Sequence, residues 1–542
     1  MITEAPINEK TAGGRFESIQ ETDMTTETTV ESHEMIAKDT KTEKQFKASP
    51  ERFAYFESLA SATHQKNVDL KEYEEYCQAI NENEIGDALL FVKAFQEKYV
   101  WDAYEGNNGT WYIYENGVWS VDKEKIRYKD FDKIAKKFED ISCKVDNAAS
   151  SGEFLKRSKA LRTHRRRSAV LETASAYIGL PPNENGPNRW NRLKGELPCR
   201  NGVVNLSDGS IRPASPKDFI RTFCPTPYKA DAKCPLFEKF IDEVTLGRKE
   251  LSQFLKRLLG YILLGNPKEE IVVIFYGPEG RNGKGTLVQT IEAVLGEIAR
   301  TFKSEMLLLQ TMTRNASAAS PELALLEGCH FAIFSEINKG RKIDASVVKN
   351  LSGRDTISAR KLFSNHDLAI RPTHTMILQT NFLPRAPADD HALWARNIVI
   401  PFEAHFKKDP KPKNLNHKKA DKDIKAKLLE EAPGILRFLV EGAIEYLEKG
   451  LCIPEIVSTA TNQYRSDSDA VAKFLEECCA LDPAFSTKKG DMLKAIKEYA
   501  TDNSMDIPTR NEITAQLRQK FKERSTAQCD FWAGVAIKKK DD

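Results

Sequence analysis

Three short apolar segments in the middle of the chain are its most regular pattern. They read IVVIFY at residues 271–276, HFAIFSE at 330–336 and TMILQTN at 375–381. Consecutive apolar positions are typical of a strand that helices cover on both faces, as in a mostly parallel sheet. Helical stretches separate the three segments, so the block at about residues 268–402 predicts an α/β domain.

The chain before this block divides into a tail and a folded region. Residues 1–50 are rich in Thr, Glu and Lys and nearly free of aromatics. They cannot bury enough apolar surface to offset the entropy of ordering, which predicts a disordered tail. A helical pattern begins at residue 51, and residues 100–121 predict short strands with NNG and ENG turns. The aromatic side chains there either pack a small sheet, which we favour, or stack on unpaired bases; they are Trp111, Tyr112, Tyr114 and Trp119.

Three further segments lead to the central block. The basic run KRSKALRTHRRRS at residues 156–168 either neutralises phosphates or forms a solvated helix face, and the pattern favours neither. Residues 197–213 predict a hairpin that turns at 207–209. Residues 234–244 and 253–265 are strongly helical.

The chain after the central block ends in a small domain of about 85 residues. A Lys-rich, poorly patterned stretch at 406–427 and an amphipathic helix near Ile435 precede it. Thr509 and Glu512 have the spacing of a capping box that opens a helix. Helices followed by the strand DFWAGVAIK predict a winged helix-turn-helix. Binding of DNA and a plain structural cap are equally compatible with its cations, which are Arg518, Lys520, Lys522 and residues 538–540.

The composition constrains the function without locating a site. The 542 residues contain 81 Lys and Arg against 79 Asp and Glu, a formal net charge of +2. Any nucleic-acid site must therefore be a local patch. The ten cysteines contain no CxxC pair that could close a zinc site. Apolar runs fall far short of the ~20 residues that span a bilayer, and no signal-peptide layout is present, so we expect a cytoplasmic protein without membrane contact.

A glycine-rich segment, GPEGRNGKGT at residues 277–286, follows the first apolar segment and opens a helix. In such a loop, backbone N–H groups and the helix N-terminus converge on phosphates, and Lys284 reaches the β/γ-phosphates. The spacing departs from the usual motif because Pro278 stands where the first glycine is expected and Gly285 separates the lysine from Thr286. The expected ATP-binding residues are Gly277, Gly280, Asn282, Gly283, Lys284, Gly285 and Thr286.

Polar residues at the ends of the other apolar segments extend this pattern. Glu336 ends the second segment, where a carboxylate would bind Mg²⁺ together with Thr286 and polarise the attacking water. Asn381 ends the third segment, where it would hold the same water or sense the γ-phosphate. Arg396, in DDHALWARNIVIPF, is the candidate arginine finger for a nucleotide in the neighbouring subunit.

In this order the features resemble superfamily-three helicases, specifically the phage and plasmid primase-helicase family related to poxvirus primase-helicases. The resemblance extends from about residue 80 to the C-terminus. RNGVVNLSDGSIRP is similar to the family's asparagine-glycine hairpin, and FLKRLLGYILLG to its helical collar. The run from VVKNLSGRDTISARKLF to NIVIPF is similar to the family's segment between the Walker B strand and the arginine finger.

The chain departs from the family pattern in three ways. Ser335 stands where many relatives carry an aspartate, which leaves the metal-linked and base roles to Glu336. Ala395 precedes Arg396 where paired arginines are frequent. No strand-borne aspartate pair that could hold two metals for primer synthesis is evident, since Asp467 and Asp469 have the position of helix-capping residues. Priming is therefore expected of another polypeptide.

The resemblance implies a hexameric AAA+ ring that uses ATP and Mg²⁺, encircles DNA and moves along one strand during replication initiation. It implies that residues 357–370 form a hairpin in the channel, where a solvated turn is the alternative to phosphate contact. It also implies that the C-terminal winged helix binds DNA. The expected DNA-binding residues are Arg360, Lys361, His366, Arg518 and Lys522.

The resulting prediction is a multidomain α/β protein with an AAA+-type ATPase core built on a mostly parallel sheet. The expected parts are a disordered tail (1–50), an N-terminal α+β domain (51–235), a helical collar (236–267), the ATPase domain (268–405), a helical connector (406–455) and a C-terminal winged-helix-like domain (456–542).

The expected function is that of an ATP-dependent DNA helicase of a phage, prophage or plasmid. It would act on single-stranded or forked DNA with a separate primase or other replication proteins. One alternative is an ATP-assembled, sequence-specific DNA-binding initiator or regulator that does not unwind DNA. Another is an ATP-driven remodeller of proteins.

Overall fold

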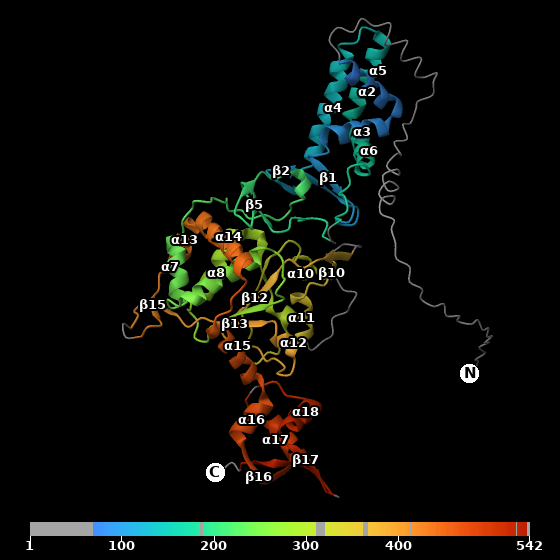
Figure 1. Ribbon diagram of the computed structural model, residues 1–542. Coiled ribbons are helices and arrows are strands. Elements are labelled where there is room, and N and C mark those ends of the chain that lie inside the picture. Colours follow the sequence, from blue (N-terminus) through green and yellow to red (C-terminus); the bar gives the residue numbers. More distant parts are fainter. Residues whose placement is uncertain are drawn as a thin grey trace, which may run out of the picture.

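A computed structural model describes residues 69–184, 188–310, 320–360, 367–411, 414–503, 505–526 and 528–538. Three parts follow one another from top to bottom of Figure 1: N-terminal helices with small sheets, a central α/β part, and a C-terminal module. The tail expected at residues 1–50 lies outside the described residues.

The N-terminal part packs helices beside a small antiparallel sheet of order β1-β2-β3. Trp111, Tyr112 and Trp119 of this sheet are 8%, 1% and 3% exposed, and the last two pack against Trp190. This burial confirms that the aromatic segment packs a small sheet. The elements are α2 (Leu70–Glu82), α3 (Glu84–Phe95), β1 (Tyr99–Asp102), β2 (Thr110–Glu115), β3 (Val118–Val121), α4 (Ile126–Ser142), α5 (Ala148–Leu161) and α6 (His164–Ser175).

The basic run at residues 156–168 lies in α5 and α6 and forms ion pairs within this part. Arg157 and Arg166 both pair with the Asp87 carboxylate, at 3.0 and 2.6 Å, and that side chain is fully buried. Two more arginines of the run pair with carboxylates of α4. Burial raises the pKa of Asp87 and the two arginines oppose that shift, so loss of either arginine would leave a buried carboxylate short of a partner and destabilise the N-terminal part.

A second antiparallel sheet, of order β4-β5-β6, connects the N-terminal and central parts. It consists of β4 (Glu196–Cys199), β5 (Gly202–Asn205) and β6 (Ile211–Arg212), followed by the 3-10 helix η1 (Pro216–Asp218). The chain turns between β5 and β6 at residues 206–210, which confirms the predicted hairpin.

The central part contains a five-stranded parallel sheet of order β13-β7-β12-β9-β8. The three predicted apolar segments form its middle strands β7, β12 and β9. On β7, Val273 and Phe275 enter the core beside α8, α9 and α14, whereas Val272 and Ile274 enter the core beside α11, α12 and α15. Helices therefore cover both faces, as the consecutive apolar positions predicted.

The bounds of this layer are as follows. The strands are β7 (Val272–Tyr276), β8 (Ala299–Phe302), β9 (Phe331–Ser335), β12 (Thr375–Thr380) and β13 (Asn397–Pro401). The helices are α7 (Pro235–Val244), α8 (Lys249–Leu263), α9 (Lys284–Leu295), η2 (Gly296–Ile298), η3 (Ser304–Leu307), α10 (Pro321–Ala324), α11 (Ala345–Ser352), α12 (His391–Trp394), α14 (Ala432–Lys449) and α15 (Glu455–Ser468).

Two glycines let α8 and α14 approach at backbone distance. A Cβ on Gly260 would lie 2.0 Å from the backbone of Gly442 and Ala443, and a Cβ on Gly442 would lie 2.1 Å from the Lys256 carbonyl oxygen. Both helices contribute to the core that also contains one face of the sheet. This contact joins α14, which follows the central sheet in the chain, to α8, which lies in the predicted collar.

Smaller elements lie around the central sheet. The strands β10 (Ile357–Arg360) and β11 (Asp367–Ile370) pair antiparallel, and residues 361–366 between them are outside the described residues. In the Lys-rich stretch, β14 (His405–Lys407) pairs parallel with β15 (His417–Lys419), and α13 (Ile424–Glu430) follows.

The C-terminal module has its own apolar core and an antiparallel sheet of order β16-β18-β17. Its order along the chain is α16 (Ala470–Cys478), β16 (Cys479–Lys488), α17 (Lys489–Asp502), α18 (Arg510–Lys520), β17 (Lys522–Ser525) and β18 (Asp530–Ile537). The predicted capping box of Thr509 and Glu512 opens α18. Asp469 caps α16 by accepting a hydrogen bond from the Ala472 amide at 2.9 Å, which confirms its capping role.

Candidate functional site

The glycine-rich loop lies between β7 and α9, at the carboxyl edge of the parallel sheet. Lys284 begins α9 and is 6% exposed. Its Nζ donates to the Gly277 carbonyl oxygen at 2.8 Å, to Asn282 Oδ1 at 2.8 Å and to Asn381 Oδ1 at 3.0 Å. The lysine is thus held at the centre of the loop and joined to the end of β12.

Strand order explains why residues far apart in sequence meet here. In the register of the sheet, Tyr276 pairs with Thr380 and Ser335 pairs with Gln379. Because β12 lies between β7 and β9, the residues that follow these three strands emerge at the same edge. Asn381 therefore contacts Lys284 directly, and the Glu336 carboxylate lies close enough to act on the lysine charge.

Burial makes Lys284 an unusual lysine. Removal from water lowers its pKa to about 8, and the negative charge of Glu336 offsets part of this effect. Oxygen acceptors surround the ammonium group, but none of its three hydrogen-bond partners is a carboxylate. A phosphate group would supply the missing negative charge and restore the ordinary preference for the protonated form.

Two glycines in the loop are required by their surroundings. A Cβ on Gly277 would lie 2.0 Å from Asn282 Nδ2 and 2.8 Å from Lys284 Nζ. Gly283 has a φ of +85° and a Cβ there would lie 2.5 Å from Val244 of α7. The loop can hold its lysine only if both positions lack a side chain.

The remaining loop residues fit a phosphate-bearing ligand. Asn282 is 3% exposed, and its Nδ2 has no hydrogen-bond acceptor among the described residues. Thr286 lies half-buried in the first turn of α9, and Gly280 and Gly285 leave space beside the backbone, with nothing within 4 Å of a Cβ at either position. The first N–H groups of a helix also lack intrahelical partners. These donors match the oxygen atoms of a triphosphate.

Glu336 and Thr286 are suited to Mg²⁺ because this ion uses few carboxylates and takes its other ligands from water and phosphate. Glu336 is exposed just after β9, and its carbonyl oxygen accepts a hydrogen bond from Ser304 Oγ at 3.0 Å. Across the described ranges, no group of three or more His, Cys, Asp or Glu side chains forms a metal site made by protein ligands alone.

Arg396 lies at the opposite edge of the sheet, just before β13. Its carbonyl oxygen accepts a hydrogen bond from the Val272 amide at the start of β7. Its Nη2 donates to Glu270 Oε2 at 2.9 Å, and Arg354 Nε lies 3.3 Å from the other oxygen of that carboxylate. The structure therefore does not bring Arg396 to the loop of its own subunit, and it adds Arg354 as a second arginine beside it.

The expected DNA-binding residues fall into two places. Arg360 ends β10, where its amide donates to Ser320 Oγ at 3.2 Å, whereas Lys361 and His366 lie outside the described residues. In the C-terminal module, Arg518 pairs with Glu523 at 2.7 Å, and Lys522 is exposed on β17. The two sets belong to separate parts of the molecule (Figure 1).

Sequence patterns did not indicate several residues that contact the loop. Phe406 of β14 donates its amide to the Arg281 carbonyl oxygen at 2.8 Å, and its ring stacks with Phe240 of α7. His405 Nδ1 lies 3.6 Å from Glu279 Oε2. Phe406 lies in the poorly patterned Lys-rich stretch, where no periodicity marks it as a neighbour of the loop.

Among the helices of the described ranges, none is both long and apolar enough to cross a bilayer.

Comparisons with known proteins identify relatives over part of the chain. A family model described as "D5 N terminal like" matches residues 88–246. A "putative helicase" of Acanthamoeba polyphaga mimivirus is 30% identical over 323 residues, which cover 56% of this chain and 32% of the viral protein. A "putative primase" of African swine fever virus is 24% identical over 264 residues, which cover 47% of this chain and 27% of that protein. The chain thus spans about a third of the length of the first of these relatives and about a quarter of the second.

Among solved structures, the apo C-terminal region of NrS-1 resembles 83% of this chain and 99% of its own length. The sequence identity is 13% and the TM-score is 0.41.

Proposed function

We propose that this chain, which belongs to the D5-like primase-helicase family, is an ATP-dependent DNA helicase that acts in replication initiation of a phage, prophage or plasmid. The observation that carries the proposal is the position of Lys284, held in a glycine loop, bonded to Asn381 and facing Glu336. The relatives described as helicases and primases of large DNA viruses support the same class of activity.

The loop residues would bind and orient the triphosphate. The amides at the start of α9 and the Asn282 Nδ2 donate to phosphate oxygens, and the Lys284 ammonium neutralises charge that builds up on them. Bound Mg²⁺ would supply further charge neutralisation, with Thr286 and Glu336 as its protein ligands. Glu336 accepts a proton from the attacking water, and Asn381 fixes that water while it holds Lys284 in place.

The position of Arg396 supports a ring. It lies at the amino edge of the sheet, whereas the glycine loop lies at the carboxyl edge. The strand β7 separates the two edges; it has five residues and is therefore roughly 16 Å long. From the amino edge the arginine would serve a nucleotide in the adjacent subunit, and the ATP sites would then lie between the subunits of an AAA+-type hexamer. The strand order that brings Asn381 between the loop and Glu336 supports the same assignment.

The C-terminal module supports a winged-helix assignment. Its order of helix, strand, two helices and two strands, with an antiparallel sheet, is the arrangement that we expect of a winged helix-turn-helix. Lys522 is exposed on the wing-like pair of β17 and β18, where it can approach phosphates. Arg518 would exchange its bond with Glu523 for a phosphate contact.

Strand displacement on forked DNA tests the helicase proposal. Lys284→Ala should abolish ATP hydrolysis and unwinding, whereas the exposed control Lys123→Ala should retain both. Glu336→Gln should still bind ATP but hydrolyse it at least about 100-fold more slowly, because it lacks the general base. Hydrolysis without strand displacement in the wild-type protein would instead favour the ATP-assembled initiator. Unwinding by Lys284→Ala would refute the site.

A mixing experiment tests the shared site. Lys284→Ala and Arg396→Ala should each be inactive alone. In an equal mixture, about a quarter of the interfaces of a head-to-tail ring combine an intact lysine with an intact arginine. ATP hydrolysis should therefore return to about a quarter of the wild-type rate. A mixture that stays inactive contradicts an arginine supplied by the neighbour.

A further inference from the structure

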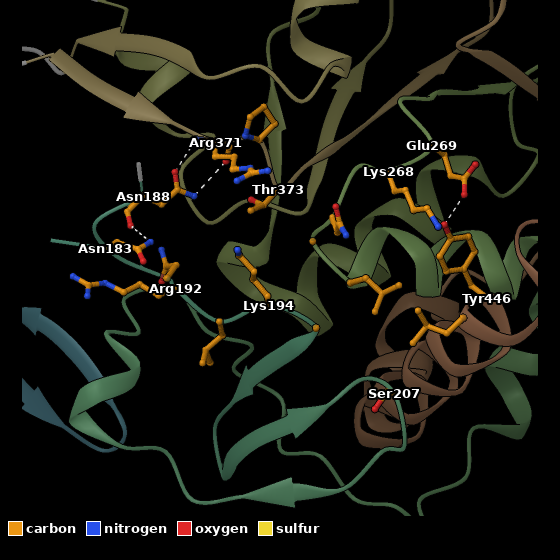
Figure 2. A pocket seen from close by; sticks show the side chains of 18 of the residues that line it. Asn183, Asn188, Arg192, Lys194, Ser207, Lys268, Glu269, Arg371, Thr373 and Tyr446 are labelled. Atoms are coloured by element: carbon orange, nitrogen blue, oxygen red, sulfur yellow. Dashed lines mark hydrogen bonds between the residues drawn. The ribbon is translucent and has the colours of Figure 1, made fainter. Parts of the chain in front are cut away.

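A cavity of about 510 Å³ lies between the N-terminal and central parts (Figure 2). One wall comes from residues 188–195, before β4. The opposite wall comes from residues 264–269, before β7, and residues 371–373, before β12. The cavity therefore adjoins the amino edge of the parallel sheet, whereas the glycine loop, Glu336 and Asn381 lie at the carboxyl edge. It is separate from the proposed ATP site.

The lining is strongly cationic. Four basic side chains line the cavity against one carboxylate; they are Arg192, Lys194, Lys268 and Arg371, with Glu269 as the acid. The acid is engaged, because the hydroxyl of Tyr446 donates to its Oε1 at 2.5 Å. The remaining lining is rich in asparagine, and such amides donate to phosphate oxygens and to base edges.

Two of the cations are available to a ligand. Lys268 and Arg371 are exposed, and neither forms an ion pair with any described residue. Lys194 points from the N-terminal wall toward the segment that contains Arg371 and Thr373 (Figure 2). Arg192 instead stacks on Phe219, with its guanidinium carbon 4.1 Å from the ring centroid, and donates to backbone carbonyls.

The walls are held in place before any ligand binds. The Asn188 side chain accepts from the Arg371 amide at 2.7 Å and donates to the Arg371 carbonyl oxygen at 3.2 Å. Asn191 Oδ1 accepts from the amides of Arg221 and Thr222, both at 2.8 Å. Both contacts of Asn188 are to backbone atoms, so they leave the Arg371 side chain free to contact a ligand in the cavity.

The cavity begins where the β10–β11 pair ends, because β11 ends at Ile370 and the next residue, Arg371, lines the cavity. We propose that this cavity binds phosphodiester groups of the same single DNA strand that contacts the hairpin. The inference rests on the proposed helicase function. It adds a second DNA contact, formed jointly by the N-terminal and central parts.

The test compares a double variant of the cavity with a matched control. Lys268→Ala/Arg371→Ala removes two cations from the cavity, and Lys123→Ala/Arg200→Ala removes two exposed cations that form no ion pair with described residues. Binding of a labelled oligo-dT strand is measured against KCl concentration. Each phosphate contact to a single strand contributes about 0.7 to the slope of log K on log salt, so the cavity variant should lose about 1.4 and the control nothing. Arg371→Lys should retain most of the slope.

An unchanged slope and affinity in the cavity variant would overturn the proposal. The proposal would also be overturned if the cavity variant lost only its binding of free dTMP or inorganic phosphate, since the cavity would then hold a small molecule. Strand displacement separates this inference from the proposed function. If the wild-type protein unwinds forked DNA and the cavity variant keeps the wild-type salt dependence of binding, only the proposal for the cavity is refuted. If the cavity variant loses the expected slope but the wild-type protein does not unwind forked DNA, only the proposed helicase function is refuted.

Discussion

Nucleotide binding should depend on pH through Lys284, whose pKa burial lowers to about 8. The free protein holds this lysine as an ammonium group below pH 8 and as a neutral amine above it. A triphosphate binds the charged form, because only that form attracts its oxygen atoms. Phosphate groups have a second pKa of about 6, so the ligand itself is about nine-tenths ionised at pH 7 and changes little up to pH 9.

The expected size of this pH effect follows from the titration of the Lys284 ammonium group alone. At pH 9 about one lysine in eleven is protonated, so the affinity for Mg-ATP should fall about tenfold between pH 7 and pH 9. At pH 8 about half of the sites must take up a proton when they bind nucleotide. Binding should therefore consume about 0.5 proton per site at that pH.

Isothermal titration calorimetry in buffers with different ionisation enthalpies measures both quantities. Lys284→Arg is the matched control, because a guanidinium stays charged over this range. Its affinity, although weaker, should not change between pH 7 and pH 9. A wild-type affinity that is flat over this range, or binding at pH 8 without proton uptake, would show that the phosphates do not contact this ammonium group.

Two further predictions concern stability. Gly260→Ala should lower the free energy of unfolding by about 3 kcal/mol or more, because its Cβ would lie 2.0 Å from the backbone of α14. Denaturant titrations measure this loss. In the same assay the control Gly152→Ala, at an exposed position of a helix, should be neutral or stabilising by up to about 1 kcal/mol. Burial lowers the pKa of His330 and His374 to about 4, so the unfolded chain binds more protons than the fold between about pH 6.5 and pH 4. The free energy of unfolding should thus be highest above pH 6.5 and fall below it, by up to about 1.4 kcal/mol per pH unit for each histidine. Urea titrations at pH 7 and pH 5 measure this loss. The variant His374→Leu should lose about half as much free energy of unfolding between the two pH values as the wild type, because only His330 then contributes.

Local patterns were sufficient for much of the central part. Consecutive apolar residues identified β7, β9 and β12, because a strand buried on both faces leaves no polar alternation. The spacing of Thr509 and Glu512 identified the start of α18, since a capping box involves only residues three positions apart. The basic run at 156–168 was different. The sequence left open whether its arginines neutralise phosphates or form a solvated helix face, and it did not indicate the pairing of Arg157 with Asp87, which lies 70 residues earlier.

The sequence by itself determined the apolar strands, the position of the glycine loop and the position of Lys284 at its end, because each depends on residues that are neighbours along the chain. Only the tertiary structure decided that Asn381, 97 residues away, bonds to Lys284, since this contact depends on β12 lying between β7 and β9. The same holds for the cavity at Arg371, whose wall is completed by Asn188 from a separate part of the chain. Contacts of this kind depend on how the strands and segments are ordered in space, and periodicity along the chain does not specify that order.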